Sequence, residues 1–102
     1  MIPATTVGEQ RKKEILRAAI RVAKAKGYML MSRDEIALEA NCANGSVNRY
    51  FGSMEVLRNA VMIKAVADYN LVIIGQGLAM RHPVARKASR QIKETVATRL
   101  IS

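Results

Sequence analysis

The stretch from Ser32 to Phe51 constrains the fold most, because it contains the signals for two short helices joined by a tight turn. Ser32 precedes Glu35 by three residues, and at this spacing each side chain can hydrogen-bond to the other residue's backbone N–H at a helix start. Asn41 can end that helix, because Asn tolerates the left-handed conformation. A second short helix is expected over residues 44 to 50. Together these signals predict a helix-turn-helix.

The exposed side of this second helix is expected to be small and polar, with the Asn44 side chain as the cap at its start. At about 100° per residue, Val47 and Tyr50 share one side of the helix, while Gly45 and Arg49 lie opposite. Arg49 should therefore point outward, and Gly45 would let another backbone approach closely. Such a face suits the major groove of DNA, where Arg can form two hydrogen bonds to guanine. Its flanking side chains are Ser46 and Asn48.

The charge of the chain points to a polyanionic partner or an anionic membrane surface, because 17 lysines and arginines face 8 acids, a net charge of +9. Residues 1–31 hold seven basic and two acidic side chains, and residues 81–102 hold six and one. Residues 32–52, by contrast, hold two basic and three acidic side chains. This division suits phosphate contacts from the ends and base reading from the middle. The expected phosphate contacts are Lys12, Lys13, Arg17, Arg33 and Tyr50.

The run from Arg11 to Leu57 resembles the N-terminal DNA-binding domain of the tetracycline-repressor (TetR) family of transcriptional regulators. The shared positions are Ile15, Leu16, Ala19, Gly27, Ile36, Ala37, Ala40, Tyr50, Phe51, Ser53 and Leu57. The resemblance implies that the second helix of the helix-turn-helix enters the major groove, with its N-terminal residues near the base edges. In this chain those residues are Asn44, Gly45 and Ser46. The family usually has an aromatic residue where this chain has Asn48, and a phosphate-binding Lys where it has Met54.

An unusually apolar stretch follows, since 15 of the 21 residues from Met54 to Ile74 are apolar. We expect one long helix, broken by Gly75-Gln76-Gly77 and capped at its start by Ser53. A helix that is apolar on nearly all sides must be buried on nearly all sides, so a second subunit is the expected cover. Glu55, Arg58, Lys64 and Asp68 argue against a membrane span. The expected dimerisation residues are Val61, Ala65, Val66, Tyr69, Val72, Ile73, Ile92 and Val96.

The remaining segments complete an all-α plan. Residues 1–8 are expected to form a flexible arm, and a first helix should run from about Glu9 to Lys26, where Gly27 ends it. Residues 9–52 then form a three-helix DNA-binding head, and residues 53–102 a dimerisation region. That region ends in a basic amphipathic helix with Pro83 in its first turn. The apolar positions that recur every four residues in this last helix are Val84, Ala88, Ile92 and Val96.

Catalytic and metal chemistry have no candidate residues in this sequence. His82 is the single histidine, and we expect it to be exposed in a connecting segment. Cys42 is the single cysteine, so no internal disulfide can form, and this suits a reducing cytoplasm. No secretory signal, metal-ligand cluster or phosphate-binding glycine motif is present, and we expect neither a cofactor nor enzyme activity.

The sequence therefore predicts a small cytoplasmic transcriptional regulator that binds a partly palindromic DNA site as a homodimer. Repression by excluding RNA polymerase is preferred over activation by recruiting it. The family resemblance implies a long C-terminal domain with an inducer pocket, yet only 28 residues follow Ile74, so no inducer pocket is expected. Two other classes stay open: a nonspecific architectural nucleic-acid-binding protein, and a protein-interaction module that has lost DNA binding.

Overall fold

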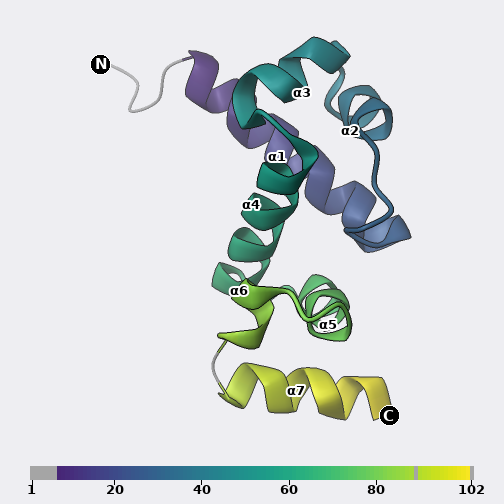
Figure 1. The fold of residues 1–102 in the computed structure, drawn as a ribbon, viewed down its shortest axis with the longest axis vertical. Coiled ribbons are helices and arrows are strands. Elements are labelled where there is room, and N and C mark those ends of the chain that lie inside the picture. Colours follow the sequence, from purple (N-terminus) through teal and green to yellow (C-terminus); the bar gives the residue numbers. More distant parts are fainter. Residues whose placement is uncertain (1–6, 89, 102) are drawn as a thin grey trace.

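The computed structural model describes residues 7–88 and 90–101, and all regular elements in these ranges are helices (Figure 1). The all-α prediction is confirmed. The principal extents of the molecule are 42 × 34 × 21 Å. The first six residues of the expected N-terminal arm lie outside the described ranges. The helices are α1 (Val7–Lys26), α2 (Arg33–Ala40), α3 (Asn44–Phe51), α4 (Met54–Ala67), α5 (Leu71–Ala79), α6 (Pro83–Arg86) and α7 (Arg90–Ile101).

Local capping signals fix most helix ends of the first half. The Ser32 hydroxyl accepts a hydrogen bond from the Glu35 N–H at 3.2 Å, and the Glu35 carboxylate accepts one from the Ser32 N–H at 3.2 Å. The Ser53 hydroxyl accepts from the Val56 N–H at the start of α4. Gly27, with φ +99°, ends α1, and Asn41, with φ 55°, ends α2. These ends agree with the sequence prediction, although α1 begins at Val7, two residues earlier than expected.

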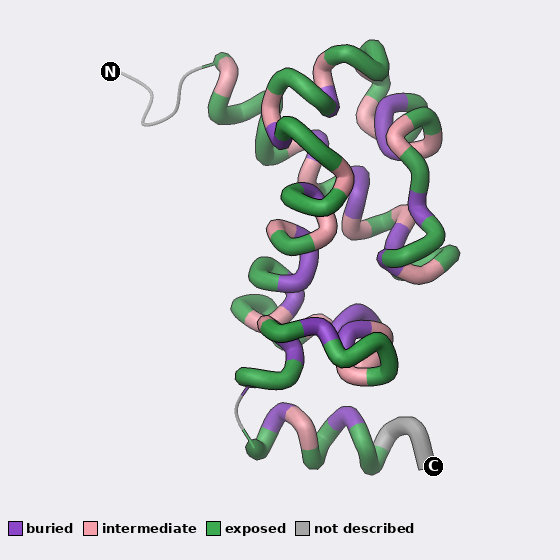
Figure 2. The backbone as a smooth tube through the Cα atoms, in the orientation of Figure 1, coloured by how far each residue is buried: buried purple, intermediate pink, exposed green. Residues whose placement is uncertain are grey.

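The seven helices form a head and a tail that share one continuous core. In the head, α1 packs against α2, α3 and α4, and in the tail α5 packs against α4, α6 and α7 (Figure 1). The largest fully buried side chains include Ile15 and Ile36 in the head, Leu57 and Met62 in α4, and Ile74 in α5. Because α4 contributes to both ends of this core, it is the element that joins head to tail (Figure 2).

The predicted long helix from Met54 to Ile74 is wrong, because the chain breaks at Tyr69. Tyr69 has φ 56°, and the N–H groups of Tyr69 and Asn70 bond to the carbonyls of Val66 and Ala65. This pattern closes α4 as a left-handed residue commonly closes a helix. The Asn70 side chain then accepts a hydrogen bond from the Ile73 N–H and caps α5. The apolar surface is therefore folded back on itself within one chain.

The Gly75-Gln76-Gly77 segment does not break a helix, as the sequence suggested, but lies inside α5. A Cβ at Gly77 would lie 2.6 Å from Met62 Cε and 2.8 Å from Ala85 Cβ, so the missing side chain lets α5 approach α4 and α6. A Cβ at Gly75 would lie 3.3 Å from Val96 on α7. The last predicted helix is divided as well, since α6 ends at Arg86 and α7 begins at Arg90.

Five of the eight predicted dimerisation residues are buried inside the single chain: Val61, Ala65, Ile73, Ile92 and Val96. These five cannot act as direct contacts between two copies of this fold, because α5, α6 and α7 supply the cover that we assigned to a second subunit. Val66 is half-buried, whereas Tyr69 and Val72 are exposed. Among the described residues, no helix has the length and apolar character needed to cross a membrane.

Candidate nucleic-acid interface

The outer face of α3 presents a small polar surface to solvent. Val47 and Phe51 on the inner face are buried, whereas Gly45, Asn48 and Arg49 are exposed. The helix period puts these two sets on opposite sides, since a residue and those three or four positions on share a face. Arg49 therefore extends from a helix whose other side is fixed to the core of the head. No atom outside the adjoining backbone lies within 4 Å of a Cβ placed at Gly45.

The first turn of α3 differs from the prediction, because Asn44 is not its cap. The N-cap is Ala43, whose side chain cannot accept a hydrogen bond. The Asn44 side chain instead donates a short hydrogen bond to the Asp34 carboxylate in α2. This contact joins the first turns of the two helices of the helix-turn-helix. Ser46 and Tyr50 flank the exposed face of α3 and are half-buried.

Two ion pairs hold α2 against α1. Arg21 Nε lies 2.7 Å from Glu39 Oε1, and the Lys26 ammonium group contacts the Glu35 carboxylate. Hydrogen bonds from Lys26 and Ser32 lower the pKa of Glu35 below its usual value. The acids of α2 are thereby paired with bases of α1, which reduces their repulsion of a polyanion on the adjoining surface.

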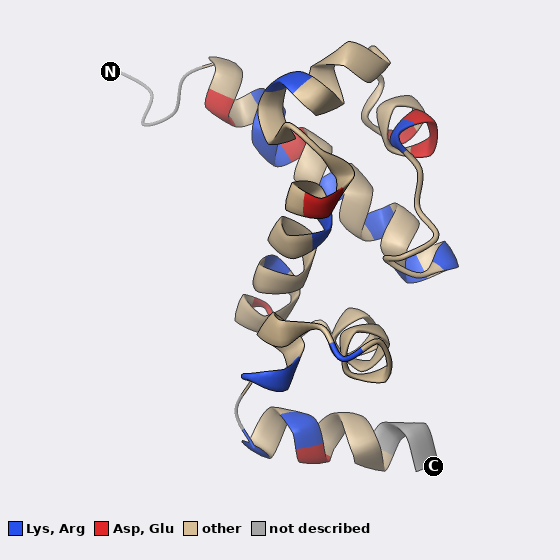
Figure 3. Ribbon diagram, viewed as in Figure 1, with Lys and Arg blue, Asp and Glu red and all other residues tan. Residues whose placement is uncertain are grey.

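Basic side chains of the first half of α1 lie near the α3 end of the head (Figure 3). Lys12 and Lys13 are exposed, and Lys12 Nζ lies 5.2 Å from the centre of the Phe51 ring at the end of α3. Such a cation over an aromatic face is attracted by the ring electrons. Arg17 is exposed on α1 as well. Arg33 is half-buried, and its Nε is buried without a hydrogen-bond partner among the described residues.

The junction between head and tail contains polar contacts that sequence reasoning missed. The Gln76 side chain accepts a hydrogen bond from the Tyr28 N–H and donates one to the Ala23 carbonyl, each at 3.0 Å. Arg58 Nε donates to the Tyr28 carbonyl at 3.3 Å. These contacts join α4 and α5 to the end of α1. The partners are 30 to 53 positions apart in the sequence, so no local pattern indicates them.

The prediction that His82 is exposed is wrong. The side chain is buried, its Nδ1 accepts a hydrogen bond from the Val84 N–H, and its Nε2 lies 2.8 Å from Asn59 Oδ1. Its ring also meets the Tyr28 ring edge to face, with the ring centres 5.7 Å apart. Burial lowers the pKa of His82 below its ordinary value, because the charged ring would lose its hydration. His82 is therefore a neutral structural link between α4, α6 and the head.

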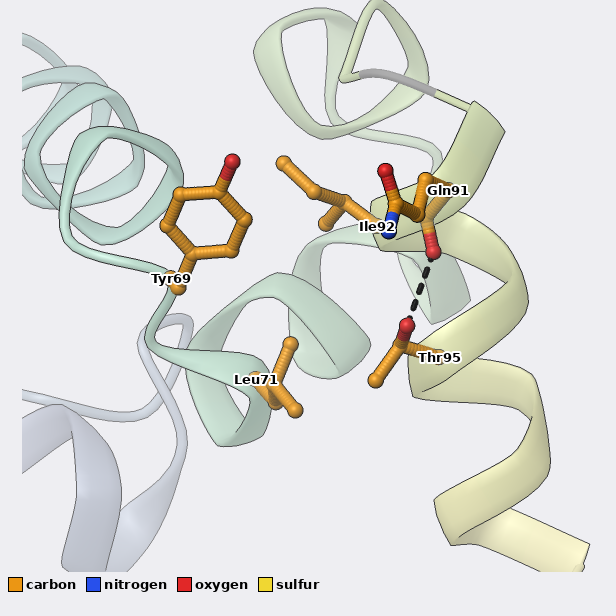
Figure 4. A pocket seen from close by; sticks show the side chains of 5 residues that line it. All are labelled: Tyr69, Leu71, Gln91, Ile92 and Thr95. Carbon is orange, nitrogen blue, oxygen red and sulfur yellow. Dashed lines mark hydrogen bonds between the residues drawn. The ribbon is translucent and has the colours of Figure 1, made fainter.

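Two surface hollows lie outside the α3 face. A groove of about 360 Å³ between α1 and α4 is floored by Leu16, Phe51, Val56 and Ala60 and edged by Lys12 and Lys13. A smaller hollow of about 270 Å³ lies between the α4–α5 turn and α7 (Figure 4). The residues around the second hollow are Tyr69, Leu71, Gln91, Ile92 and Thr95. The Thr95 hydroxyl there donates to the Gln91 carbonyl at 2.9 Å, which is a bond within α7.

The two short helices, the tight turn and the exposed polar face of α3 define a helix-turn-helix protein of the DNA-binding class. The family model described as "Bacterial regulatory proteins, tetR family" matches residues 15–61. This part of the chain belongs to the TetR family as its N-terminal DNA-binding domain, and the family is one of transcription regulators. Neither the curated proteins nor the solved structures gave a match to the chain.

Proposed function

We propose that this chain is a sequence-specific regulator of transcription that binds a partly palindromic DNA site as a homodimer in the cytoplasm. The observation that carries the proposal is the exposed face of α3, where Gly45, Asn48 and Arg49 stand opposite a buried apolar face. The head is held rigid by its core and by the ion pairs between α1 and α2. A rigid support of this kind suits sequence reading, because a displaced guanidinium loses its paired hydrogen bonds.

In the proposed complex α3 enters the major groove with Arg49 directed at a base edge. The guanidinium matches the two acceptors that guanine presents there, O6 and N7. Gly45 has no side chain between the helix backbone and the DNA, so the first turn can approach closely. Ser46 is the second candidate reader, and Asn48 can donate to a phosphate. Tyr50, at the half-buried flank, is a further candidate phosphate contact.

Asn44 has a different proposed role from the one that the sequence suggested. Its amide is bonded to Asp34, so we assign it to positioning α3 relative to α2 rather than to reading a base. The contact leaves the Asp34 charge close to the interface. Asp34 can therefore disfavour binding in registers that place a phosphate beside it, which contributes to specificity.

Phosphate contacts are assigned to the basic residues of α1. Lys12 and Lys13 are exposed near the end of α3, so they can meet the strand that borders the groove. Arg17 is more distant along α1, and Arg33 has part of its guanidinium buried. The net charge of +9 also attracts DNA at long range. These contacts position the head but carry no sequence information by themselves.

Two copies would extend the site from one half-site to two, spaced by about one helical turn, as in other dimeric helix-turn-helix proteins. A dimer bound over a promoter would exclude RNA polymerase, and we therefore propose repression. No inducer is assigned to this mechanism. The two groups of basic residues at the chain ends favour a nonspecific nucleic-acid-binding protein as the second candidate, because phosphate attraction is independent of sequence.

The first experiment selects bound duplexes from a random DNA pool and then compares Arg49→Ala with the unchanged chain. We expect the variant to lose about 1 to 3 kcal/mol of binding free energy on the selected site and to relax the preference at one base pair. The control is Arg86→Ala, because Arg86 is exposed on α6 in the tail, far from α3 (Figure 1). Equal losses on selected and random duplexes would contradict base reading by Arg49 and favour the nonspecific candidate.

A further inference from the structure

The outward face of α4 has an apolar stripe that the single chain leaves uncovered. Val56 and Ile63 have exposed fractions of 50% and 56%, Ala60 is half-buried and Ala67 is exposed. The opposite face of the same helix is buried in the core, so the stripe points away from α1 and α5 (Figure 2). A helix with a core on one side normally carries polar residues on the other. The exception on α4 therefore needs a physical explanation.

The spacing of the stripe is that of a helix-pairing seam. Val56, Ala60, Ile63 and Ala67 are separated by four, three and four residues, which is the a and d pattern of two helices packed side by side. Branched side chains alternate with alanines along the seam. The alanines allow two helix backbones to approach closely, and the branched residues fill the layers between them.

The charges around the stripe favour a second copy of this chain as the partner. With a net charge of +9, two copies repel each other wherever basic surfaces meet. The stripe itself has no charged residue. Beside it, Lys64 Nζ lies 3.4 Å from Asp68 Oδ2, so the flank that carries a base also carries its counter-charge. The outward face of α4 is thus a surface on which two copies can meet without strong repulsion.

The upper end of the stripe continues into the apolar groove between α1 and α4. Val56 and Ala60 belong to both, and Leu16 and Phe51 extend the apolar surface beneath the groove. A helix laid along the stripe would cover this groove in addition to the four seam residues. The contact is therefore larger than a single helix face, and it excludes water from apolar surface that the monomer leaves exposed.

We propose that α4 pairs with α4 of a second copy through Val56, Ala60, Ile63 and Ala67, with the two helices parallel about a two-fold axis. This inference rests on the proposed function for its direction. Because α4 begins directly after α3 and runs away from it, a parallel pair places both α3 helices at the same end of the dimer (Figure 1). An antiparallel pair would place them at opposite ends, where they cannot meet one duplex.

Cysteine trapping tests both the surface and the direction of the helices. In a Cys42→Ala background, Ala60→Cys and Ala67→Cys are each oxidised under mild conditions and examined on non-reducing gels. In a parallel pair each new cysteine faces its own symmetry mate, so both variants should form covalent dimers at least about tenfold faster than the exposed control Ala25→Cys on α1. Equal rates for all three would overturn the proposal, and a fast reaction at Ala60 but not at Ala67 would overturn the parallel direction.

A charge within the seam gives an independent measurement. Ile63→Asp should convert the dimer to a monomer in sedimentation equilibrium while leaving the helical circular dichroism unchanged, since Ile63 is exposed in the monomer. The matched control is Leu30→Asp, because Leu30 is an exposed apolar residue away from α4, with an exposed fraction of 74%. Unchanged dimerisation in Ile63→Asp would reject this surface. A monomeric unchanged chain that still binds a selected half-site would reject the pairing and leave sequence-specific DNA binding intact.

Discussion

Single glycines of this chain are required for different reasons, and Gly45 is the one that the fold does not require. It lies in the first turn of α3 on the exposed face, and a Cβ there would contact no other part of the molecule. Glycine in a helix is less favourable than alanine by about 0.5 to 1 kcal/mol. Its presence at a position with free space is explained by the approach of a second molecule rather than by packing within the chain.

Gly45→Ala should therefore separate stability from binding. The free energy of unfolding should rise by about 0.5 to 1 kcal/mol, because alanine loses less conformational freedom on folding. Affinity for the selected duplex should fall, because a methyl group now stands between the helix and the groove. Urea unfolding and a binding titration measure the two effects. An unchanged affinity would contradict close approach of this turn to DNA.

At the level of elements, the break at Tyr69 and the packing of α5 decide the shape of the tail. The turn after α4 reverses the chain, so that α5 covers apolar residues that a straight helix would have left open. Helices cross most closely where one of them has no side chain. In α5 that position is Gly77, which faces Met62 of α4 and Ala85 of α6.

Gly77→Ala should act opposite to Gly45→Ala, although both replace a helical glycine with the same residue. The new Cβ would lie 2.8 Å from Ala85 Cβ, and Ala85 cannot move without displacing α6. Overpacking of this kind commonly lowers the free energy of unfolding by about 1 to 3 kcal/mol, more than the gain in helix propensity. Urea unfolding of the two variants side by side provides the measurement. A stabilised Gly77→Ala chain would show that α5 is not held as closely as described.

For the whole molecule, the junction around Tyr28 determines whether head and tail fold as one unit. Gln76, Arg58 and His82 reach this segment from α5, from α4 and from the residue before α6. Their hydrogen bonds and ring contact link the end of α1 to the tail. Protonation of His82 disturbs this junction, because Nδ1 can no longer accept the hydrogen bond from Val84.

We expect the stability of the whole chain to fall in mild acid. Burial holds the pKa of His82 below its ordinary value of 6.5, so in that range the unfolded chain binds more protons than the folded chain. The contribution of neutral His82 is fully present above the ordinary pKa and is lost as the pH falls from there through the folded pKa. Urea unfolding at a series of pH values from neutral to mildly acid measures the loss.

His82→Asn is the control for this pH dependence, because its side-chain oxygen can still accept the hydrogen bond that caps α6. The variant should show a smaller loss of stability over the same pH range. Equal losses in the two proteins would assign the pH dependence to another group and leave His82 without a role in it.

The sequence determined the elements whose signals lie within a few residues of each other. The Ser32–Glu35 box, Asn41 and Gly27 set helix ends, and the alternation around Val47 placed Arg49 and Gly45 outward. These features depend on neighbours within one or two helical turns, so they can be read from the order of residues. The similarity to the TetR family rests on the same local positions, and the family match to residues 15–61 agrees with it.

The tertiary structure decided everything that depends on residues far apart in the chain. The apolar run after Met54 indicated burial but not what buries it, because the same pattern suits a partner subunit and a helix folded back from the same chain. The left-handed turn at Tyr69, the contacts across Gly77 and the burial of His82 resolved this in favour of the chain itself. Only after that cover was in place could the uncovered face of α4 be identified, since an exposed stripe is what remains when all intrachain contacts are known.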